Sequence, residues 1–224
     1  QLKEELHYKD GKLDGIWTSW DDTGQILYER KFKDGKEIGD GGSIITRFKN
    51  GQKKSEKNYT DNKQEGKSSL WYDNGQLKGE GKYRNDLKDG RWTEWDVNGK
   101  KILEENYIEG NLVSENLFKY HNNGQIEYER SYKNGLKDGK WTYWYQNGQL
   151  KEELHYKDGK LDGIWTEWDD TGKKSLEATY KNDNLVTETK YIYTYYPNGK
   201  IRSKKTLKDR KREGKFSLWY DNGQ

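Results

Sequence analysis

The stretch DGIWTEWDDTGK, from Asp162 to Lys173, decides the fold, because nearly the same residues occur as DGIWTSWDDTGQ from Asp14 to Gln25. The match extends beyond this stretch. Residues 1–24 equal residues 149–172 at 23 of 24 positions and differ only at Ser19 and Glu167. A block has therefore been copied at an offset of 148 residues, which indicates a protein built from repeats.

A glycine that follows Asn or Thr and precedes Gln or Lys marks each repeat; we call it the turn glycine. It occurs nine times, at spacings of 24 to 27 residues: Gly24, Gly51, Gly75, Gly99, Gly124, Gly148, Gly172, Gly199 and Gly223. Residues 1–224 are therefore one continuous repeat array with a 148-residue duplicated block. Because the chain starts and stops at repeat boundaries, we expect it to be a fragment of a longer array.

Other residue types are fixed relative to the turn glycine. An aromatic residue lies four positions before it in eight repeats: Trp20, Trp71, Trp95, Tyr120, Trp144, Trp168, Tyr195 and Trp219. Glutamate lies five positions after it in seven: Glu29, Glu56, Glu80, Glu104, Glu129, Glu153 and Glu177. Glycine recurs nine positions before it, a second tryptophan seven before it, and another ring eight after it.

The composition suits a thin sheet better than a thick core. Leu, Ile, Val and Phe make up about 16% of the residues, whereas Trp, Tyr and Phe together make up 14%. Aromatic rings can supply most of the buried area, since each buries roughly 150–250 Å². The net charge of +3 gives no reason to expect nucleic acid, and the absence of cysteine excludes disulfides and thiolate metal sites.

Each repeat is predicted to be a β-hairpin. Asn-Gly between runs of aromatic and β-branched residues is a strong signal for a tight turn with positive φ at both positions. The second connection, as in Tyr156 to Gly163, is expected to be longer and built on Asp-Gly. The predicted fold is all-β: an elongated, single-layer antiparallel meander of about nine stacked hairpins. The two tryptophans of a repeat are three residues apart, so they point to opposite faces unless a bulge lies between them.

The stretch from Tyr156 to Lys173 resembles the MORN repeat, and looks closest to the bacterial variant of about 24 residues found in proteins described as YwqK-type antitoxins. The resemblance covers essentially all nine repeats, with a poor fit at Gly110–Gly124, Asp183–Gly199 and Glu37–Gly51. It implies an extended hairpin ribbon with a scaffolding or protein-binding role. It also implies a bacterial source, with the cell envelope or secretion favoured over the cytoplasm.

The residues give little sign of catalysis. The regular row of glutamates is best explained by pairing with lysine and arginine across strands. The three histidines include the copied pair His7 and His155, with His121 in an irregular repeat. No motif for a nucleophile or a calcium loop is present. We expect no enzyme activity, no cofactor and no metal.

The aromatic rows are explained either by packing between repeats or by a partner-binding surface. The candidate binding residues are Tyr72, Tyr145, Tyr196, Tyr220, Trp71, Trp95, Trp144 and Trp168. The favoured function is a non-catalytic scaffold that binds another protein along this aromatic-rich face. The alternatives are an antitoxin that neutralises a cognate toxin and a carbohydrate-binding module of the cell envelope. The exposed edge strands also allow self-association.

Overall fold

The computed structural model describes residues 2–24, 26–37, 42–60 and 63–222. All regular structure in these residues is β-strand, which confirms the expected all-β class. The strands form two compact units, Gln1–Glu115 and Asn116–Gln224. Within the described part of the chain, no helix is long and apolar enough to cross a membrane.

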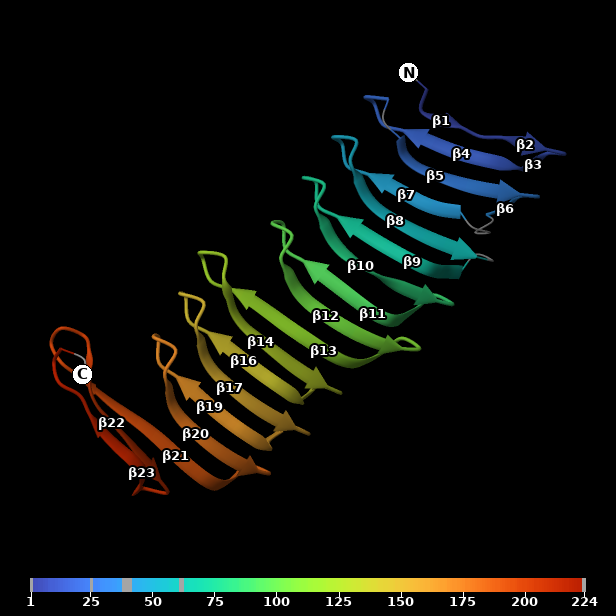
Figure 1. Cartoon of the computed structure of the whole chain (residues 1–224). Coiled ribbons are helices and arrows are strands. Elements are labelled where there is room, and N and C mark those ends of the chain that lie inside the picture. The colour runs from blue at the N-terminus through green and yellow to red at the C-terminus, as the bar shows by residue number, and fades with distance from the viewer. Residues whose placement is uncertain (1, 25, 38–41, 61–62, 223–224) are drawn as a thin grey trace. The chain divides into compact units, whose positions relative to one another are not determined.

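The first unit holds β1 (Glu4–Glu5), β2 (Tyr8–Lys9), β3 (Lys12–Leu13), β4 (Gly15–Trp20), β5 (Ile26–Lys33), β6 (Lys36–Glu37), β7 (Gly42–Arg47), β8 (Lys53–Thr60), β9 (Lys63–Trp71), β10 (Leu77–Arg84), β11 (Leu87–Trp95) and β12 (Lys101–Ile108). Its long strands pair antiparallel in chain order from β4 to β12, and β1 pairs with β4 (Figure 1). Strands β2 and β3 form a separate small ladder.

The second unit holds β14 (Ile126–Lys133), β15 (Leu136–Lys137), β16 (Gly139–Trp144), β17 (Leu150–Lys157), β18 (Lys160–Leu161), β19 (Gly163–Trp168), β20 (Lys174–Lys181), β21 (Asn184–Tyr195), β22 (Ile201–Lys208) and β23 (Lys211–Leu218). Strand β13 (Asn111–Tyr120) spans the boundary between the units. The long strands from β14 to β23 again pair antiparallel in chain order. Each unit is thus a single-layer meander, as predicted.

The two hairpin connections differ from the expectation. In the Asn-Gly loop, the Tyr72 N–H donates to the Gln76 oxygen at 2.8 Å, and the Gly75 N–H donates to the Tyr72 oxygen at 3.0 Å. Only Gly75 has a positive φ, at 85°. This is a three-residue loop in which a type I turn is followed by a left-handed glycine. The expectation of positive φ at both positions was therefore wrong here.

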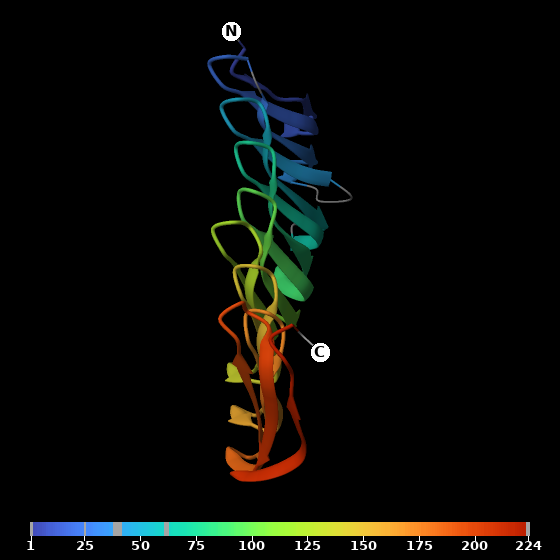
Figure 2. The ribbon, with the colours of Figure 1, turned by 60° about the vertical axis from the view of Figure 1, so that its left-hand side comes forward.

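The tight two-residue turns are instead at the second connection of the repeat, as at Asp158 and Gly159 and at Asn134 and Gly135. Lys157 pairs with Lys160 across Asp158 and Gly159, and both turn residues have positive φ, 48° and 86°. A turn of this kind matches the right-handed twist of the strands that it joins. The second connection is therefore the shorter one, and the expectation that it is longer was wrong. The five-residue segments around the turn glycines project together along one side of each unit (Figure 2).

A β-bulge recurs at one place in the repeat. One strand has an extra residue three positions after the turn glycine: Leu27, Lys54, Lys78, Ile102, Lys151, Ser175 and Arg202. Between its two tryptophans β11 has no insertion in its pairing with β12, because Trp92 to Trp95 face Glu105, Glu104, Leu103 and Lys101 in turn. The two tryptophans of this repeat therefore lie on opposite faces, which settles the alternative that the sequence left open.

The glycines nine positions before the turn glycine lie opposite the ring residues eight positions after it. Gly90 lies opposite Tyr107, Gly139 opposite Tyr156, and Gly163 opposite Tyr180. This position thus combines the glycine and ring rows of the sequence into one cross-strand pair.

Gly81 in β10 is a second kind of glycine, required by a close approach. A Cβ added there would meet the Trp92 ring at 2.1 Å, whereas a Cβ at Gly79 would meet nothing nearer than 3.8 Å. The indole of Trp92, which is 7% exposed, therefore lies directly on the Gly81 backbone. Its Nε1 donates to the Lys82 oxygen at 3.0 Å.

We predict that Gly81→Ala lowers the free energy of unfolding by about 2–3 kcal/mol, because the added methyl displaces the indole. Gly79→Ala in the same strand is the matched control and should stabilise by about 0.5–1 kcal/mol, since glycine costs entropy in a strand. Urea unfolding followed by tryptophan fluorescence measures both. Equal effects of the two variants would contradict the close approach.

Candidate functional site

One face of the meander is sealed by rings; we call it the ring face. It carries the tryptophans seven positions before the turn glycine: Trp17, Trp92, Trp141 and Trp165. In the second unit, the Trp141 ring lies 5.2 Å from Tyr132 and 5.0 Å from Tyr156, on the strands to either side. Its Nε1 donates to the Ser131 oxygen at 2.8 Å. This indole is 5% exposed, so it fills the seam between neighbouring hairpins.

Lysine side chains pack over the rings of these seams. Lys88 Nζ lies 4.6 Å from the Trp92 ring and 4.5 Å from the Tyr107 ring, and Lys137 lies 4.6 Å from Trp141 and 4.7 Å from Tyr156. Burial by itself lowers the pKa of Lys88, but its hydrogen bond to Tyr107 and the charge of Glu105 outweigh it and hold that pKa above its usual value. Both lysines stabilise the rings by cation–π contact.

The opposite face carries the glutamate row; we call it the glutamate face. Glu104 lies opposite Thr93, and Thr93 lies opposite Glu80 on its other side. In the second unit, Thr142 lies between Glu129 and Glu153. Carboxylates therefore alternate with hydroxyls across the strands, and the glutamates are about 10 Å apart. Thr142 is only 3% exposed.

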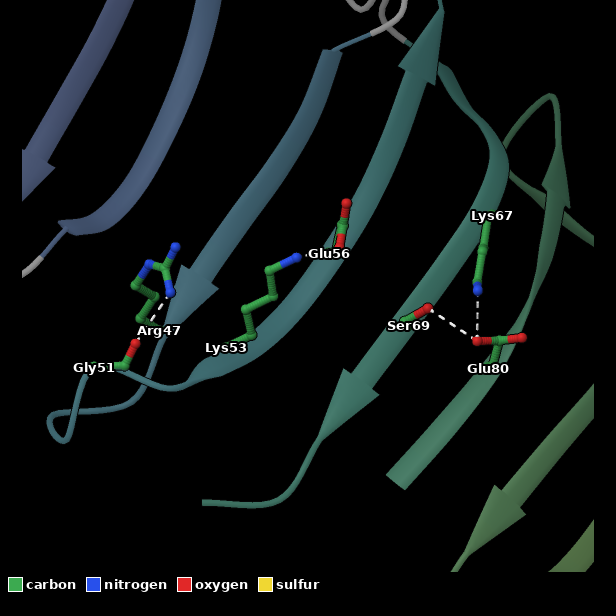
Figure 3. Close-up of polar contacts among 7 residues, drawn as sticks. All are labelled: Arg47, Gly51, Lys53, Glu56, Lys67, Ser69 and Glu80. Carbon is green, nitrogen blue, oxygen red and sulfur yellow. Dashed lines mark hydrogen bonds and ion pairs between the residues drawn. The ribbon is translucent and has the colours of Figure 1, made fainter. Parts of the chain in front are cut away.

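Five of these glutamates form ion pairs with lysine. Glu80 and Glu153 pair with Lys67 and Lys140 of the neighbouring strand, each at 2.8 Å. Glu56, Glu104 and Glu177 pair with the lysine three residues earlier on their own strand, at 2.9, 3.0 and 2.6 Å. Figure 3 shows both kinds, Lys67–Glu80 between strands and Lys53–Glu56 along one strand. The expected lysine pairing is confirmed for these five. The bulge explains the pairs within a strand, because it brings residues three apart to one face.

The tryptophans four positions before the turn glycine also lie on the glutamate face. Trp71, Trp95, Trp144 and Trp168 are all half-buried, unlike Trp92 and Trp141 on the ring face. The Lys53 ammonium group lies 5.6 Å from the Trp71 ring. The candidate tryptophans are therefore brought onto one face within each unit, and part of each indole remains accessible.

The candidate tyrosines have a structural role that the sequence did not reveal. The hydroxyl of Tyr72 donates to the oxygen of Trp95 at 3.0 Å, and that of Tyr145 to the oxygen of Trp168 at 2.9 Å. Tyr196 does the same to Trp219 at 2.7 Å. Each phenol thus joins its loop to the loop of the next repeat, 23 residues on. Tyr220 is 75% exposed.

The asparagine before the turn glycine also forms a hydrogen bond to the loop of the next repeat. Asn74 accepts a hydrogen bond from the Gln76 N–H at 3.0 Å and donates to the Val97 oxygen at 3.1 Å. Asn147 does likewise with the Gln149 N–H and the Asp170 oxygen. One amide therefore stabilises its own loop and binds the next one. We call the aromatic and asparagine bonds together the loop staple.

Some loops have aspartate in place of the aromatic residue. Asp169 Oδ1 accepts hydrogen bonds from the Thr171 N–H, the Thr171 hydroxyl and the Lys173 N–H at 3.0, 2.6 and 2.9 Å. Asp96 accepts from Asn98 and Lys100 within its own loop. These carboxylates stabilise the loop to which they belong.

The residue three positions before the turn glycine varies with the spacing to the next turn glycine. The aspartate loops at Asp21, Asp96 and Asp169 precede the spacings of 27, 25 and 27 residues, whereas every 24-residue spacing follows an aromatic residue at that position. A staple that reaches 23 residues ahead requires the next loop to lie in register, so only the 24-residue repeats can form it. The array therefore has a higher period of three repeats, readable in the sequence from this position alone.

On the ring face, two carboxylates, those of Glu152 and Glu167, face each other across neighbouring strands. They lie directly opposite each other in β17 and β19. Burial, and next to it the charge of Glu167, raises the pKa of the Glu152 carboxyl. In the first copy of the block, the corresponding pair is Glu4 and Ser19, which has no second charge. The one difference between the copies thus falls on this contact.

A shallow cavity of about 360 Å³ lies beside this contact. Trp165, Glu167 and Leu176 line one side, and Lys190 and Ile192 of β21 line the other. It lies at the 27-residue repeat, where the β20–β21 pairing ends at Leu176 and Lys190. Across the described residues, no three His, Cys, Asp or Glu side chains gather closely enough to hold a metal ion.

Comparison with known proteins identifies the repeat. The family described as "MORN repeat variant" matches residues 13–34, 64–85, 116–134, 137–158, 161–182 and 191–209, more than half of the chain. No curated protein matches the chain in sequence. A solved structure titled "Crystal Structure of TcdB2-TccC3-Cdc42" is similar at 12% identity and a TM-score of 0.23, over 96% of this chain and 13% of that one.

We predict that Tyr145→Phe lowers the free energy of unfolding by about 1 kcal/mol, because the Trp168 oxygen loses its donor. The matched control is Tyr220→Phe, whose ring is mostly exposed and whose stability should not change. Urea unfolding measures both variants. A Tyr145→Phe protein as stable as the parent would show that the loop staple does not stabilise the array.

We predict that Glu167→Ser, which restores the residue of the first copy, stabilises the protein at pH 7 by about 0.5 kcal/mol. Because the folded-state pKa of Glu152 is raised, its ionised form destabilises the fold. That cost disappears as the pH falls below the ordinary value of 4.5, so the advantage of the variant should shrink there. The reverse change, Ser19→Glu, should destabilise with the same pH dependence. Thermal midpoints between pH 3.5 and 7.5 test both, and a pH-independent difference would refute the charge argument.

Proposed function

Because the chain belongs to the MORN repeat variant family, we propose that it is a non-catalytic repeat scaffold that binds a protein partner along its glutamate face. The observation that carries the proposal is a row of tryptophans on the glutamate face. Trp71, Trp95, Trp144 and Trp168 recur at one position of the repeat and are all half-buried, so part of each indole is open to a partner. On the ring face, Trp92 and Trp141 are buried with their Nε1 groups bonded, whereas Trp17 and Trp165 are half-buried.

The spacing of these indoles suits an extended segment. Two strands of about 4.8 Å separate equivalent positions of successive 24-residue repeats, so neighbouring indoles lie about 10 Å apart. A partner chain in the polyproline II conformation advances about 3.1 Å per residue with three residues per turn, so it would present every third residue to successive indoles. Indole rings offer large contact areas at low entropic cost, which is why they are frequent among the residues that dominate binding.

The glutamate face carries many charged side chains, but glutamates beside the tryptophans are paired with lysines. Glu104 pairs with Lys101 beside Trp95, and Glu177 pairs with Lys174 beside Trp168. A partner therefore meets apolar rings separated by ion pairs, which favours orientation by hydrogen bonds over attraction by net charge. The tyrosines of the loop staple support this face from its edge, since Tyr145 is bonded to the backbone of Trp168.

We predict that Trp144→Ser combined with Trp168→Ser weakens partner binding at least tenfold, because half-exposed indoles are removed without touching the ring face. Leu136→Ser is the matched control in the same unit, since Leu136 is 51% exposed and lies away from the row. A partner recovered by cross-linking would be expressed separately, and its affinity for the three proteins measured by calorimetry.

Unchanged affinity of the double variant would overturn the assignment of this face. Binding of glycans in place of protein would support the carbohydrate-binding alternative. Relief of the toxicity of a neighbouring gene product would support the antitoxin alternative.

A further inference from the structure

The ring-face seam at Trp165 lacks the lysine that covers other seams of this face. Lys137 stands four positions before Trp141, and its ammonium group lies 4.6 Å from the centre of that ring. The residue four positions before Trp165 is Leu161. Among the residues that the structure describes, no lysine or arginine lies over the Trp165 ring. This indole is half-buried and has no cation against it.

The two copies of the duplicated block differ in charge at this seam. In the first copy, Arg30 stands opposite Trp17, and its guanidinium group lies 5.8 Å from the centre of that ring. In the second copy, Ala178 stands in the place of this arginine. Glu167 of the second copy stands in the place of Ser19. At these two positions, the second copy has therefore lost a positive charge and gained a negative one.

The carboxylates of the seam have no counter-ion from the chain. Glu152 in β17 lies directly opposite Glu167 in β19. Within the described part of the chain, neither forms an ion pair with lysine or arginine, whereas five glutamates of the opposite face do. Burial and the charge of Glu167 raise the pKa of Glu152, as expected for close carboxylates without a cation between them.

The shallow cavity of about 360 Å³ gives access to this seam. It lies where β21 continues beyond the end of its pairing with β20 (Figure 1). Trp165 and Glu167 line one side, and Leu176 and Ile192 add apolar surface. Pockets for small ligands begin at roughly 300 Å³, so the cavity has room for one side chain or one small molecule.

Lys190 also lines the cavity, but its ammonium group is already paired. It lies 3.3 Å from the carboxylate of Glu188, which is on the same strand. The group that the seam lacks must therefore come from outside the described chain.

From these observations we propose that the seam at Trp165 binds a guanidinium or ammonium group on an aliphatic stem, such as the side chain of arginine or lysine in a partner protein. The cation would lie between the carboxylates of Glu152 and Glu167 and against the Trp165 ring, as the guanidinium group does at the same seam of the first copy. The stem would lie along Leu176 and Ile192. Cation–π attraction and charge-assisted hydrogen bonds then act on the same group.

The site is separate from the surface assigned to the partner above. Trp165 is on the ring face, whereas Trp168 is on the glutamate face. Loss of binding at one face therefore leaves binding at the other to be measured on its own.

Two probes distinguish the sources of the cation. The first is a short glycine–serine peptide with one central arginine, and the second is N-acetylarginine amide. Nuclear magnetic resonance detects weak binding, and both probes should shift the indole N–H signal of Trp165, which is assigned by its loss in Trp165→Phe. The same peptide with citrulline, which has the shape of arginine without its charge, should cause no shift.

Tighter binding of the peptide than of the amide would support a protein segment as the source. Equal or tighter binding of the amide would support a free small molecule with the same cationic group. The absence of a shift with both probes, or an equal shift with the citrulline peptide, would overturn the proposal.

Removal of one carboxylate tests the role of the acidic pair. Glu167→Gln should weaken binding of the arginine peptide about fivefold, because one of the two charges that face the cation is lost. Glu109→Gln removes the same charge from an exposed turn of the first unit and is the matched control. Its affinity should equal that of the parent chain.

Ala178→Arg is the second variant, since it returns the cation that the first copy has at this position. The new guanidinium group would occupy the seam from within the chain, so both probes should bind at least about tenfold more weakly. The thermal midpoint shows whether the variant folds, and Glu167→Gln remains the test if it does not. A folded Ala178→Arg protein, or a Glu167→Gln protein, with the parent's affinity would show that the cation does not bind at this seam.

Discussion

Across each well-formed seam of the ring face, an indole of one strand lies against a phenol or phenyl ring of the next, and the other features of the fold depend on this contact. A single-layer sheet has no second layer against which to bury apolar residues. The chain therefore buries rings between strands: Trp141 lies between Tyr132 and Tyr156, and Trp92 lies 5.0 Å from Tyr83. The requirement explains the glycines too, because Gly81 has no side chain where the indole of Trp92 must lie.

Hydrogen bonds between loops also hold neighbouring repeats together, and not every seam has them. Where the loop carries an aromatic residue and asparagine, as at Tyr145 and Asn147, two side-chain hydrogen bonds add to the ring contact. Where it carries Asp169, the carboxylate bonds only within its own loop. The stability of such an array is a sum of repeat and interface terms, so seams without the staple contribute less. The 27-residue repeats lie at such seams, and the cavity beside Trp165 and Ile192 lies at one of them.

The sequence predicted the all-β class and the chain-order meander, because these depend on residue spacing that the turn glycines mark plainly. It did not predict the loop conformations. Asn-Gly is compatible with both a two-residue and a three-residue loop, and the chain uses both, the first at Asn134 and Gly135 and the second at Asn74 and Gly75. Nor did it predict the hydrogen bond from Tyr72 to Trp95, since a half-buried ring near a turn gives the same pattern whether it binds a partner or the next loop. The signal that distinguishes these roles is the exchange of the aromatic residue for aspartate wherever the spacing departs from 24.

The duplicated block allows the burial of identical residues to be compared in two different surroundings. Tyr8 and Tyr156 stand in the same sequence of eight residues, yet Tyr8 is 63% exposed and Tyr156 packs against Trp141. Ser68 is 3% exposed between two strands, and its counterpart Phe216 is 55% exposed where a strand lies on one side only. Burial in this fold is thus a property of adjacent repeats together, since one hairpin supplies half of each seam.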